Sequence, residues 1–364
     1  MSLRVLMTAD TVGGVWTYAC ELITALRTHD VDVTLATMDA PPSPGQARAI
    51  AALPNAELEP SSYALEWMPD PWRDVDAASD WLRGLAERVK PDLVHINGYA
   101  HAALSFGVPV ISVAHSCVCT WFRAVRGCEA PSEWDEYRRR VTAGLTAADS
   151  VVAPTQAILR SILGAYQLDR PARVIANGRD PAAWQPGTKQ PFVLAAGRLW
   201  DDAKGLATLD AAAASVAWPI HVAGPTAGPA GEGTVQARAV KLLGELRPEA
   251  LADWMSRASI YALPARYEPF GLSALEAALA GAALVLGRID TLQEVWGEAA
   301  IFVPPGDPHA LAHALHQLTA DPLRRRALAA LGRARALALT PARMAASYHE
   351  LYTELAGAKQ EVCA

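Results

Sequence analysis

The fold class of this chain is decided by one stretch, Pro264-Ala265-Arg266-Tyr267-Glu268-Pro269-Phe270-Gly271-Leu272-Ser273-Ala274-Leu275-Glu276. It follows Ala258–Leu263, an apolar run with the length of a buried strand, and it leads into an alanine- and leucine-rich segment that predicts a helix. Pro269 and Gly271 predict a turn that lets a ligand approach the backbone closely. Strand, turn and helix in this order form the unit of an open α/β sheet, which places ligands at the carboxyl ends of its strands.

The helix of this stretch should begin near Leu272, so that its free backbone N–H groups point at whatever lies above the turn. Such a helix N-terminus attracts anions and is a natural seat for a diphosphate. Glu268 precedes the helix and Glu276 lies about two turns further on, since an α-helix has ~3.6 residues per turn. Two carboxylates at this spacing are commonly ordinary helix residues. The strand, the proline and the glycine around them favour a ligand site instead.

The same alternation of β-rich runs and helical stretches continues over all 364 residues, a length that exceeds one hydrophobic core. It predicts two doubly wound parallel-sheet domains of the α/β class. The strands expected in the first half are Leu3–Thr8, Val31–Thr37, Leu93–Ile96, Val108–Val113, Ser150–Ala153 and Ala172–Ile175. Those expected in the second half are Phe192–Ala196, Ile220–Ala223, Ala258–Leu263, Ala283–Leu286 and Ala300–Val303.

A stretch with three prolines and a glycine after its first residues, Asn177–Pro191, separates the two sets of strands and is the expected linker. We therefore expect an N-terminal domain at residues 1–186 and a C-terminal domain at residues 187–340. Three helices that each begin with proline should follow the last strand. They are Pro308–Leu318, Pro322–Leu337 and Pro341–Leu355.

A pair of cations follows the strand Phe192–Ala196 and Gly197: Arg198 comes six residues before Lys204. Arginine offers a planar fork to phosphate oxygens and lysine a point charge, so together they can neutralise a diphosphate.

Two weaker signals lie in the first half. Gly13 and Gly14 open a helix after the first strand, which suits close backbone approach to a ligand. His115 ends the apolar run Val110–Ala114, and a lone histidine there is as often structural as catalytic.

Composition excludes several classes of protein. Residues 1–170 carry 14 basic and 20 acidic side chains, which argues against broad nucleic-acid binding and against attraction to anionic membranes. Arg138–Arg140 form the one compact basic cluster and, with acidic neighbours, predict a solvated helix face.

The uncharged stretch Leu93–Phe122 is interrupted by polar residues, glycine and proline, and predicts strand, helix and strand rather than a membrane span. No signal peptide is evident at the N-terminus.

The cysteines predict neither disulfides nor a metal centre. Their number is odd, without a disulfide framework, which suggests a reduced protein of the cytoplasm. They are Cys20, Cys117, Cys119, Cys128 and Cys363. Ligand spacing disfavours a metal at His115 and the three cysteines after it. Asp30-Val31-Asp32 and Asp74-Val75-Asp76 match the D-x-D pattern of metal-dependent glycosyltransferases, but neither follows a suitable strand, so we expect metal-independent chemistry and no cofactor.

Taken together, the motifs resemble the retaining glycosyltransferases of family 4 (group 1), which have the GT-B fold. They occur in the family's order over nearly the whole chain: GGVWTYACEL, PDLVHINGY, VAHS, ADSVVAPTQA, VIANGRD, AAGRLWDDAKG and YEPFGLSALEAALAG. The resemblance implies two Rossmann-like domains facing across a cleft, with a final helix at about 341–357 crossing back to the first. The chain departs from the family at Ile289–Glu294, where many members have Gly-Gly before Pro-Glu.

Carried over by motif, the resemblance implies that Arg198 and Lys204 bind the diphosphate of a UDP- or GDP-sugar. Glu276 would hold the ribose, Glu268 the donor sugar, and His115 would lie beside the reacting sugar. The remaining expected donor contacts are Gly13, Gly14, Gly197, Phe270, Gly271 and Leu272. The acceptor would be a hydroxyl of a glycan, glycolipid or small metabolite, with Trp16 and Trp121 as aromatic candidates beside it.

The expected reaction is metal-independent front-face transfer with retention of configuration, by a cytoplasmic protein without stable membrane insertion. A sugar-nucleotide epimerase of the same architecture and a non-catalytic nucleotide-sugar-binding protein remain as alternatives. A dehydrogenase is disfavoured because no G-x-G-x-x-G follows either first strand.

Overall fold

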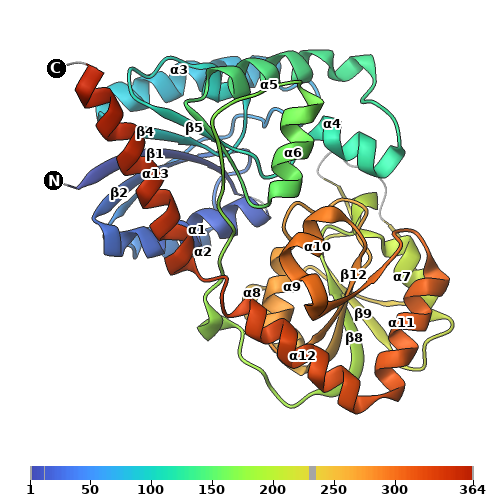
Figure 1. Ribbon diagram of the computed structural model, residues 1–364. Helices are drawn as coiled ribbons and strands as arrows, with labels where there is room; N and C mark the ends of the chain where they lie inside the picture. The colour runs from blue at the N-terminus through green and yellow to red at the C-terminus, as the bar shows by residue number, and fades with distance from the viewer. Residues whose placement is uncertain (1, 12, 229–234, 363–364) are drawn as a thin grey trace. The chain divides into compact units, whose positions relative to one another are not determined.

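The computed structural model describes residues 2–11, 13–228 and 235–362 and divides the chain into two compact units (Figure 1). Unit 1 runs to Arg123 and continues over Cys128–Gly178 and from Pro341 onward; unit 2 comprises Ala124–Gly127 and Arg179–Thr340. Each unit is built on one parallel sheet covered by helices. The predicted α/β class with two Rossmann-like domains is therefore confirmed.

The sheet of unit 1 has the order β3-β2-β1-β4-β5-β6-β7, and all of its strand pairs are parallel. Its strands are β1 (Leu3–Asp10), β2 (Val31–Met38), β3 (Ala56–Pro60), β4 (Leu93–Ile96), β5 (Val110–Val113), β6 (Ser150–Ala153) and β7 (Ala172–Val174). In β1, Val5 lies opposite Val33 on one side and Leu93 on the other. The strand order reverses between β1 and β4, so the carboxyl edge there is the topological switch point at which such sheets bind ligands.

Helices cover both faces of this sheet, because alternate strand residues point to opposite sides. Val5 and Met7 pack with Tyr18 and other residues of α1, whereas Leu6 packs with Leu82 of α3. The helices of unit 1 are α1 (Gly14–Leu26), α2 (Pro44–Ala51), α3 (Trp72–Val89), α4 (Val118–Trp121), α5 (Asp135–Ala147), α6 (Gln156–Ala165) and α13 (Pro341–Val362). Short 3-10 turns are η1 (Arg27–His29), η2 (Ala100–Ala103) and η4 (Ser132–Trp134), and η3 (Phe122–Arg126) is a π-helical turn.

The last helix, α13, belongs to unit 1 although it follows unit 2 in the sequence. It packs along α1 and against β4, and its Tyr348 and Tyr352 are almost fully buried in the core that contains Val5. In Figure 1 this red helix runs beside blue α1, so the two ends of the sequence share one core. The final helix therefore packs on the first domain, as we expected.

The sheet of unit 2 has the order β10-β9-β8-β11-β12-β13, which is the Rossmann order, and its switch point lies between β8 and β11. Its strands are β8 (Gln190–Ala196), β9 (Ile220–Ala223), β10 (Lys241–Gly244), β11 (Ala258–Leu263), β12 (Ala283–Gly287) and β13 (Ala300–Val303). Its helices are α7 (Leu206–Ala213), α8 (Pro248–Arg257), α9 (Leu272–Leu279), α10 (Asp290–Trp296), α11 (Pro308–Ala320) and α12 (Pro322–Ala336), with 3-10 turns η5 (Pro181–Ala183), η6 (Asp202–Lys204) and η7 (Gly297–Ala299). Leu194 faces the core with α9, and Val193 the core with α7 and α11.

Two strands, β3 and β10, were not predicted. Both lie at the edge of a sheet and are largely exposed, so their sequences lack the continuous apolar run of a buried strand. Residues 179–186, which we expected in the first domain, group with unit 2 because Trp184 is buried in the core beside Phe192.

The uncharged stretch Leu93–Phe122 forms β4, η2, β5 and α4, as strand, helix and strand were expected there. Among the helices in the described part of the chain, none has the length and apolar character needed to cross a bilayer.

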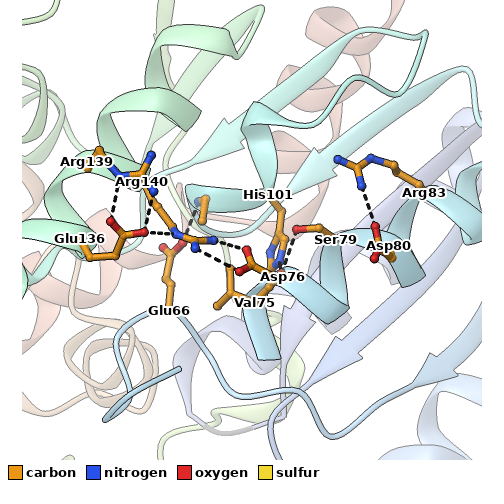
Figure 2. Close-up of polar contacts among 11 residues, drawn as sticks. Glu66, Val75, Asp76, Ser79, Asp80, Arg83, His101, Glu136, Arg139 and Arg140 are labelled. Atoms are coloured by element: carbon orange, nitrogen blue, oxygen red, sulfur yellow. Dashed lines mark hydrogen bonds and ion pairs between the residues drawn. The ribbon is translucent and has the colours of Figure 1, made fainter. Parts of the chain in front are cut away.

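The basic cluster on α5 does more than face solvent (Figure 2). Arg139 donates to both oxygens of Glu136, at 2.8 and 2.6 Å, and Arg140 donates to the same carboxylate at 2.7 Å. These hydrogen bonds lower the pKa of Glu136 to about 2. Arg140 also pairs with Asp76 of α3 and stacks over Trp72 at 4.9 Å, so the prediction of a merely solvated face is wrong for this residue. Its side chain joins two helices.

The close approach of α5 to the residue before η2 provides a stability test. A Cβ atom on Gly144 of α5 would lie 1.9 Å from the carbonyl oxygen of Tyr99, so Gly144→Ala must push α5 away from η2. We expect a loss of about 1–3 kcal/mol in the free energy of unfolding, which is the typical cost of overpacking. Denaturant unfolding followed by circular dichroism measures it.

Gly84→Ala is the matched control, because Gly84 lies in the exposed middle of α3 with no atom within 4 Å of the added Cβ. Alanine there should stabilise the protein by about 0.5–1 kcal/mol. Equal unfolding midpoints for the two variants would contradict the packing that we describe.

Candidate functional site

Two loops meet at the switch point of unit 2. One follows β8 and contains Gly197 and Arg198; the other follows β11 and leads to Gly271. Because β8 and β11 are neighbours in the sheet, both loops leave from the same edge. The backbone N–H of Arg266 donates to the carbonyl of Ala203 at 2.8 Å and joins them directly.

The centre of this edge is an ion pair between the two loops. Lys204 Nζ lies 2.7 Å from Glu268 Oε2, and the two side chains are only 14% and 15% exposed. The other oxygen of Glu268 accepts the backbone N–H of Gly271 at 3.1 Å. Thr291, near the start of α10 in the stretch where the chain departs from the family, donates its hydroxyl to the carbonyl of Glu268 at 2.6 Å. The structure therefore holds a predicted cation, a predicted carboxylate and a helix N-terminus together.

Two glycines allow this approach. Gly271 precedes α9 with φ 91°, a left-handed conformation that other residues rarely adopt. Gly205 has φ 73°, and a Cβ there would lie 2.6 Å from the carbonyl oxygen of Pro264 in the facing loop. The position of Lys204 thus depends on the glycine that follows it.

Arg198 lies at the same strand end but is more open to solvent. Its guanidinium is 3.3 Å from Asp201 Oδ2 and stacks over Trp200 at 5.4 Å, and its side chain is 46% exposed. Asp201 is buried and also accepts the backbone N–H of Ala203 at 3.0 Å. Arg198 is thereby oriented while its guanidinium stays accessible to an anion.

Glu276 lies in the second turn of α9. Its residue is only 7% exposed, and its carboxylate pairs with Arg179 at 2.9 Å. Arg179 also stacks over Trp184 at 5.2 Å. Sequence analysis did not assign Arg179 a role, although it lies in the quoted motif VIANGRD. Phe270 is buried in the core, so that only its backbone can face a ligand, and Leu272 is the first residue of α9.

The residues expected from the first half lie at the carboxyl edge of the other sheet. Gly13 is the N-cap of α1 with φ 82°, and Gly14 begins the helix. His115 follows β5; its ring stands edge-on to Tyr18 at 4.6 Å, and its Nε2 lies 2.7 Å from Asn97 Oδ1. Asn97 follows β4 inside the quoted motif PDLVHINGY and was also missed.

The histidines here are neutral near pH 7. Burial lowers the pKa of His115 to about 4 and that of His95 to about 3. His95 lies within hydrogen-bonding distance of Tyr352, Asn97 and Tyr18, so it is a fully partnered core histidine.

The two tryptophans expected near the acceptor are both partly buried. Trp16, the third residue of α1, packs on the core of unit 1. Trp121 ends α4 and stands edge-on to Phe122 at 5.3 Å.

Metal ligation finds no support in the described residues. They contain no group of three or more histidine, cysteine or acidic side chains that could hold an ion. In the second D-x-D match, Asp74 accepts the backbone N–H of Ala64 and Asp76 pairs with Arg140. The four cysteines of the described part form no disulfide, and Cys363 lies outside it.

Solved structures with the same architecture identify the class. Sucrose-phosphate synthase from Thermosynechococcus elongatus superimposes with a TM-score of 0.82 at 21% identity, covering 98% of this chain and all of that one. The Anabaena protein HepE, in complex with UDP and glucose, gives 0.72 at 16% identity over 97% of this chain and 100% of its own. The chain therefore has the GT-B fold.

Sequence comparison then gives the family. The pattern described as Glycosyltransferase Family 4 matches residues 12–183, and that of Glycosyl transferases group 1 matches residues 190–321. This chain belongs to the group 1, family 4 glycosyltransferases.

Two curated relatives are informative. Glycogen synthase of Mycobacterium tuberculosis is 32% identical in an alignment that covers 66% of this chain and 64% of that protein, so about a third of each is unaligned. Alpha-maltose-1-phosphate synthase of Mycolicibacterium smegmatis is 27% identical over 90% of this chain and 92% of its own.

The lowered pKa of His115 predicts acid sensitivity. Its pKa is about 4 in the folded chain and about 6.5 when unfolded, so the unfolded state binds more protons between these values. Folding stability should therefore fall as the pH drops from about 6.5 toward 4. His115→Gln should reduce this fall, measured as the change in Tm between pH 7 and pH 4.5.

Comparison with a variant is needed because burial raises the pKa of Glu66 to about 7, which acts in the opposite direction. His309→Gln, at an exposed position of α11, is the control and should keep the pH dependence of the parent. An unchanged slope in His115→Gln would contradict the burial effect.

Proposed function

We propose that this protein transfers a sugar from a nucleotide-diphosphate donor to a hydroxyl acceptor, with retention of configuration and without a metal ion. Unit 2 binds the donor and unit 1 the acceptor. The proposal gives the residues at the two switch points the roles that the motifs led us to expect.

One observation carries the proposal: Lys204 is held by Glu268 beside the N-terminus of α9, at the switch point of unit 2. A lysine, a half-exposed arginine and the free N–H groups of a helix offer fixed positive charge to a diphosphate. Such preorganised charge stabilises a leaving group without reorganisation during the reaction.

In the proposed reaction, the bond between the anomeric carbon and the β-phosphate oxygen breaks, and negative charge develops on the phosphate. Arg198 and Lys204 stabilise that charge. The acceptor oxygen attacks from the same face, and its proton moves to the departing phosphate oxygen, so configuration is retained. Glu268 binds hydroxyls of the donor sugar and Glu276 the ribose.

The choice of substrates to test follows from the relatives. HepE was crystallised with UDP and glucose, which puts UDP-glucose first among donors. Relatives over most of the chain are named for products that carry a sugar phosphate, so a sugar phosphate is the first acceptor class to assay.

Donor binding tests the proposed cations. Arg198→Ala and Lys204→Ala should each weaken UDP binding about 10- to 100-fold, since a hydrogen bond to a charged group contributes about 1.5–3 kcal/mol. Isothermal titration calorimetry measures this directly. The matched control is Lys241→Ala, in the exposed edge strand β10, which should bind UDP as the parent does.

Turnover is then followed as nucleoside diphosphate released from UDP-, GDP- and ADP-sugars, with sugar phosphates as acceptors and with or without EDTA. Release that persists in EDTA and disappears in Arg198→Ala supports the proposal. Loss of turnover in EDTA with recovery by a divalent metal would overturn the metal-independent mechanism. Epimerised donor without transfer would favour the epimerase alternative.

Trp16 tests the acceptor side. If its ring contacts the acceptor, Trp16→Ala should raise the KM for the acceptor severalfold while UDP binding stays unchanged, because an aromatic contact contributes about 0.5–1.5 kcal/mol. Trp218→Ala, in unit 2, serves as a control for loss of a tryptophan. An unchanged acceptor KM in Trp16→Ala would remove this residue from the site.

A further inference from the structure

Two histidines of unit 1 converge on one amide oxygen. Asn97 follows β4 at the switch point of the sheet, and its Oδ1 lies 2.7 Å from His115 Nε2 and 3.1 Å from His95 Nε2. An amide oxygen accepts hydrogen bonds and a neutral imidazole has one donor and one acceptor nitrogen. Which imidazole nitrogen carries the proton therefore depends on how this amide is oriented.

The orientation of the amide is settled by β1. Asn97 Nδ2 donates to the carbonyl oxygen of Thr8 at 2.7 Å, and the backbone N–H of Asn97 donates to the Thr8 hydroxyl at 3.0 Å. A flipped amide would bring two acceptor oxygens to 2.7 Å with no proton between them, which is repulsive. Oδ1 must therefore be the atom that faces both histidines.

It follows that each histidine donates from Nε2. The rings are neutral at pH 7, because burial holds both pKa values far below that. The single proton of each ring is thus on Nε2, and Nδ1 carries the lone pair. The contact of His95 Nδ1 with the Tyr352 hydroxyl on α13, at 2.6 Å, is compatible with this assignment, because that hydroxyl can donate to it.

The two Nδ1 atoms differ in their surroundings. That of His95 is satisfied by Tyr352 in the core, and the His95 ring is fully buried. His115 as a residue is of intermediate burial, and no hydrogen bond to its Nδ1 occurs among the described residues. A fixed lone pair at such a position can accept a hydrogen bond from a hydroxyl.

We propose that Asn97 is a positioning residue, which holds His115 as the Nε2–H tautomer so that Nδ1 can accept a hydroxyl of a substrate sugar. The role toward the sugar rests on the proposed function; the tautomer does not. Thr8 orients the amide, and Tyr352 links the same arrangement to α13, so the C-terminal helix supports a substrate contact as well as a core.

The test is nitrogen-15 NMR of the full chain with labelled histidine, at pH 7.5. His115→Gln identifies the His115 signals by their loss. We expect a protonated, pyrrole-type Nε2 and an unprotonated, pyridine-type Nδ1 for His115. A proton on Nδ1, or on both nitrogens, overturns the proposal whatever the activity of the protein.

Asn97→Leu then removes the oxygen while keeping the volume. His115 should shift toward a mixture of tautomers, and kcat should fall by up to about 100-fold, as expected when a reacting group is misplaced. UDP binding should change less than about twofold, because Arg198 and Lys204 are intact. Unchanged His115 nitrogen shifts in Asn97→Leu overturn the proposal.

Asn55→Leu is the matched control. Asn55 is a buried amide of unit 1 whose Nδ2 donates to the carbonyls of Ile23 and Val31, at 3.0 and 3.1 Å. Its loss should lower stability without changing the His115 signals. Equal changes in both variants would show a general structural effect and refute a specific role for Asn97. If the tautomer behaves as expected but no donor is ever turned over, the proposed function fails while the role of Asn97 in holding the tautomer stands.

Discussion

The reversal of strand order in each sheet is the constraint on which the candidate sites depend. In unit 2, β9 and β10 extend to one side of β8, whereas β11 to β13 extend to the other. Right-handed crossovers send the chain to opposite faces on the two sides, so the loops after β8 and β11 leave the edge in different directions. Lys204, Glu268 and the start of α9 lie where these two loops contact each other.

Burying the charged groups of unit 2 costs free energy. Lys204 and Glu268 are 14% and 15% exposed and lose most of their hydration, and their attraction offsets this loss only when further hydrogen bonds satisfy the two groups. Glu268 has such a bond from Gly271, and the buried Glu276 has Arg179. Well-packed apolar residues would stabilise these positions equally well, so the retention of charge fits a binding role better than a purely structural one.

Unit 1 presents the opposite chemistry. Its switch point holds neutral imidazoles, an amide and hydroxyls. The imidazoles are neutral because burial lowers the pKa of both His95 and His115. Neutral donors and acceptors suit the hydroxyls of a sugar, whereas fixed cations suit a diphosphate. The helix α13 completes this neutral network through Tyr352, so the end of the chain contributes to a site formed by its beginning.

Local sequence determined many of the elements, because buried strands need continuous apolar runs, and α11, α12 and α13 begin at the prolines expected. The strands β4, β6, β9, β11 and β13 begin and end where the sequence predicted. It also indicated the ligand edge of unit 2, because turn glycines and charged residues follow the strands directly. It missed the edge strands β3 and β10, which bury too little to carry an apolar pattern. Only the tertiary structure showed which residues Arg179 and Asn97 contact. Their partners lie far away in the sequence, as Glu276 and Thr8 do, and a hydrogen bond or ion pair between distant residues leaves no local pattern.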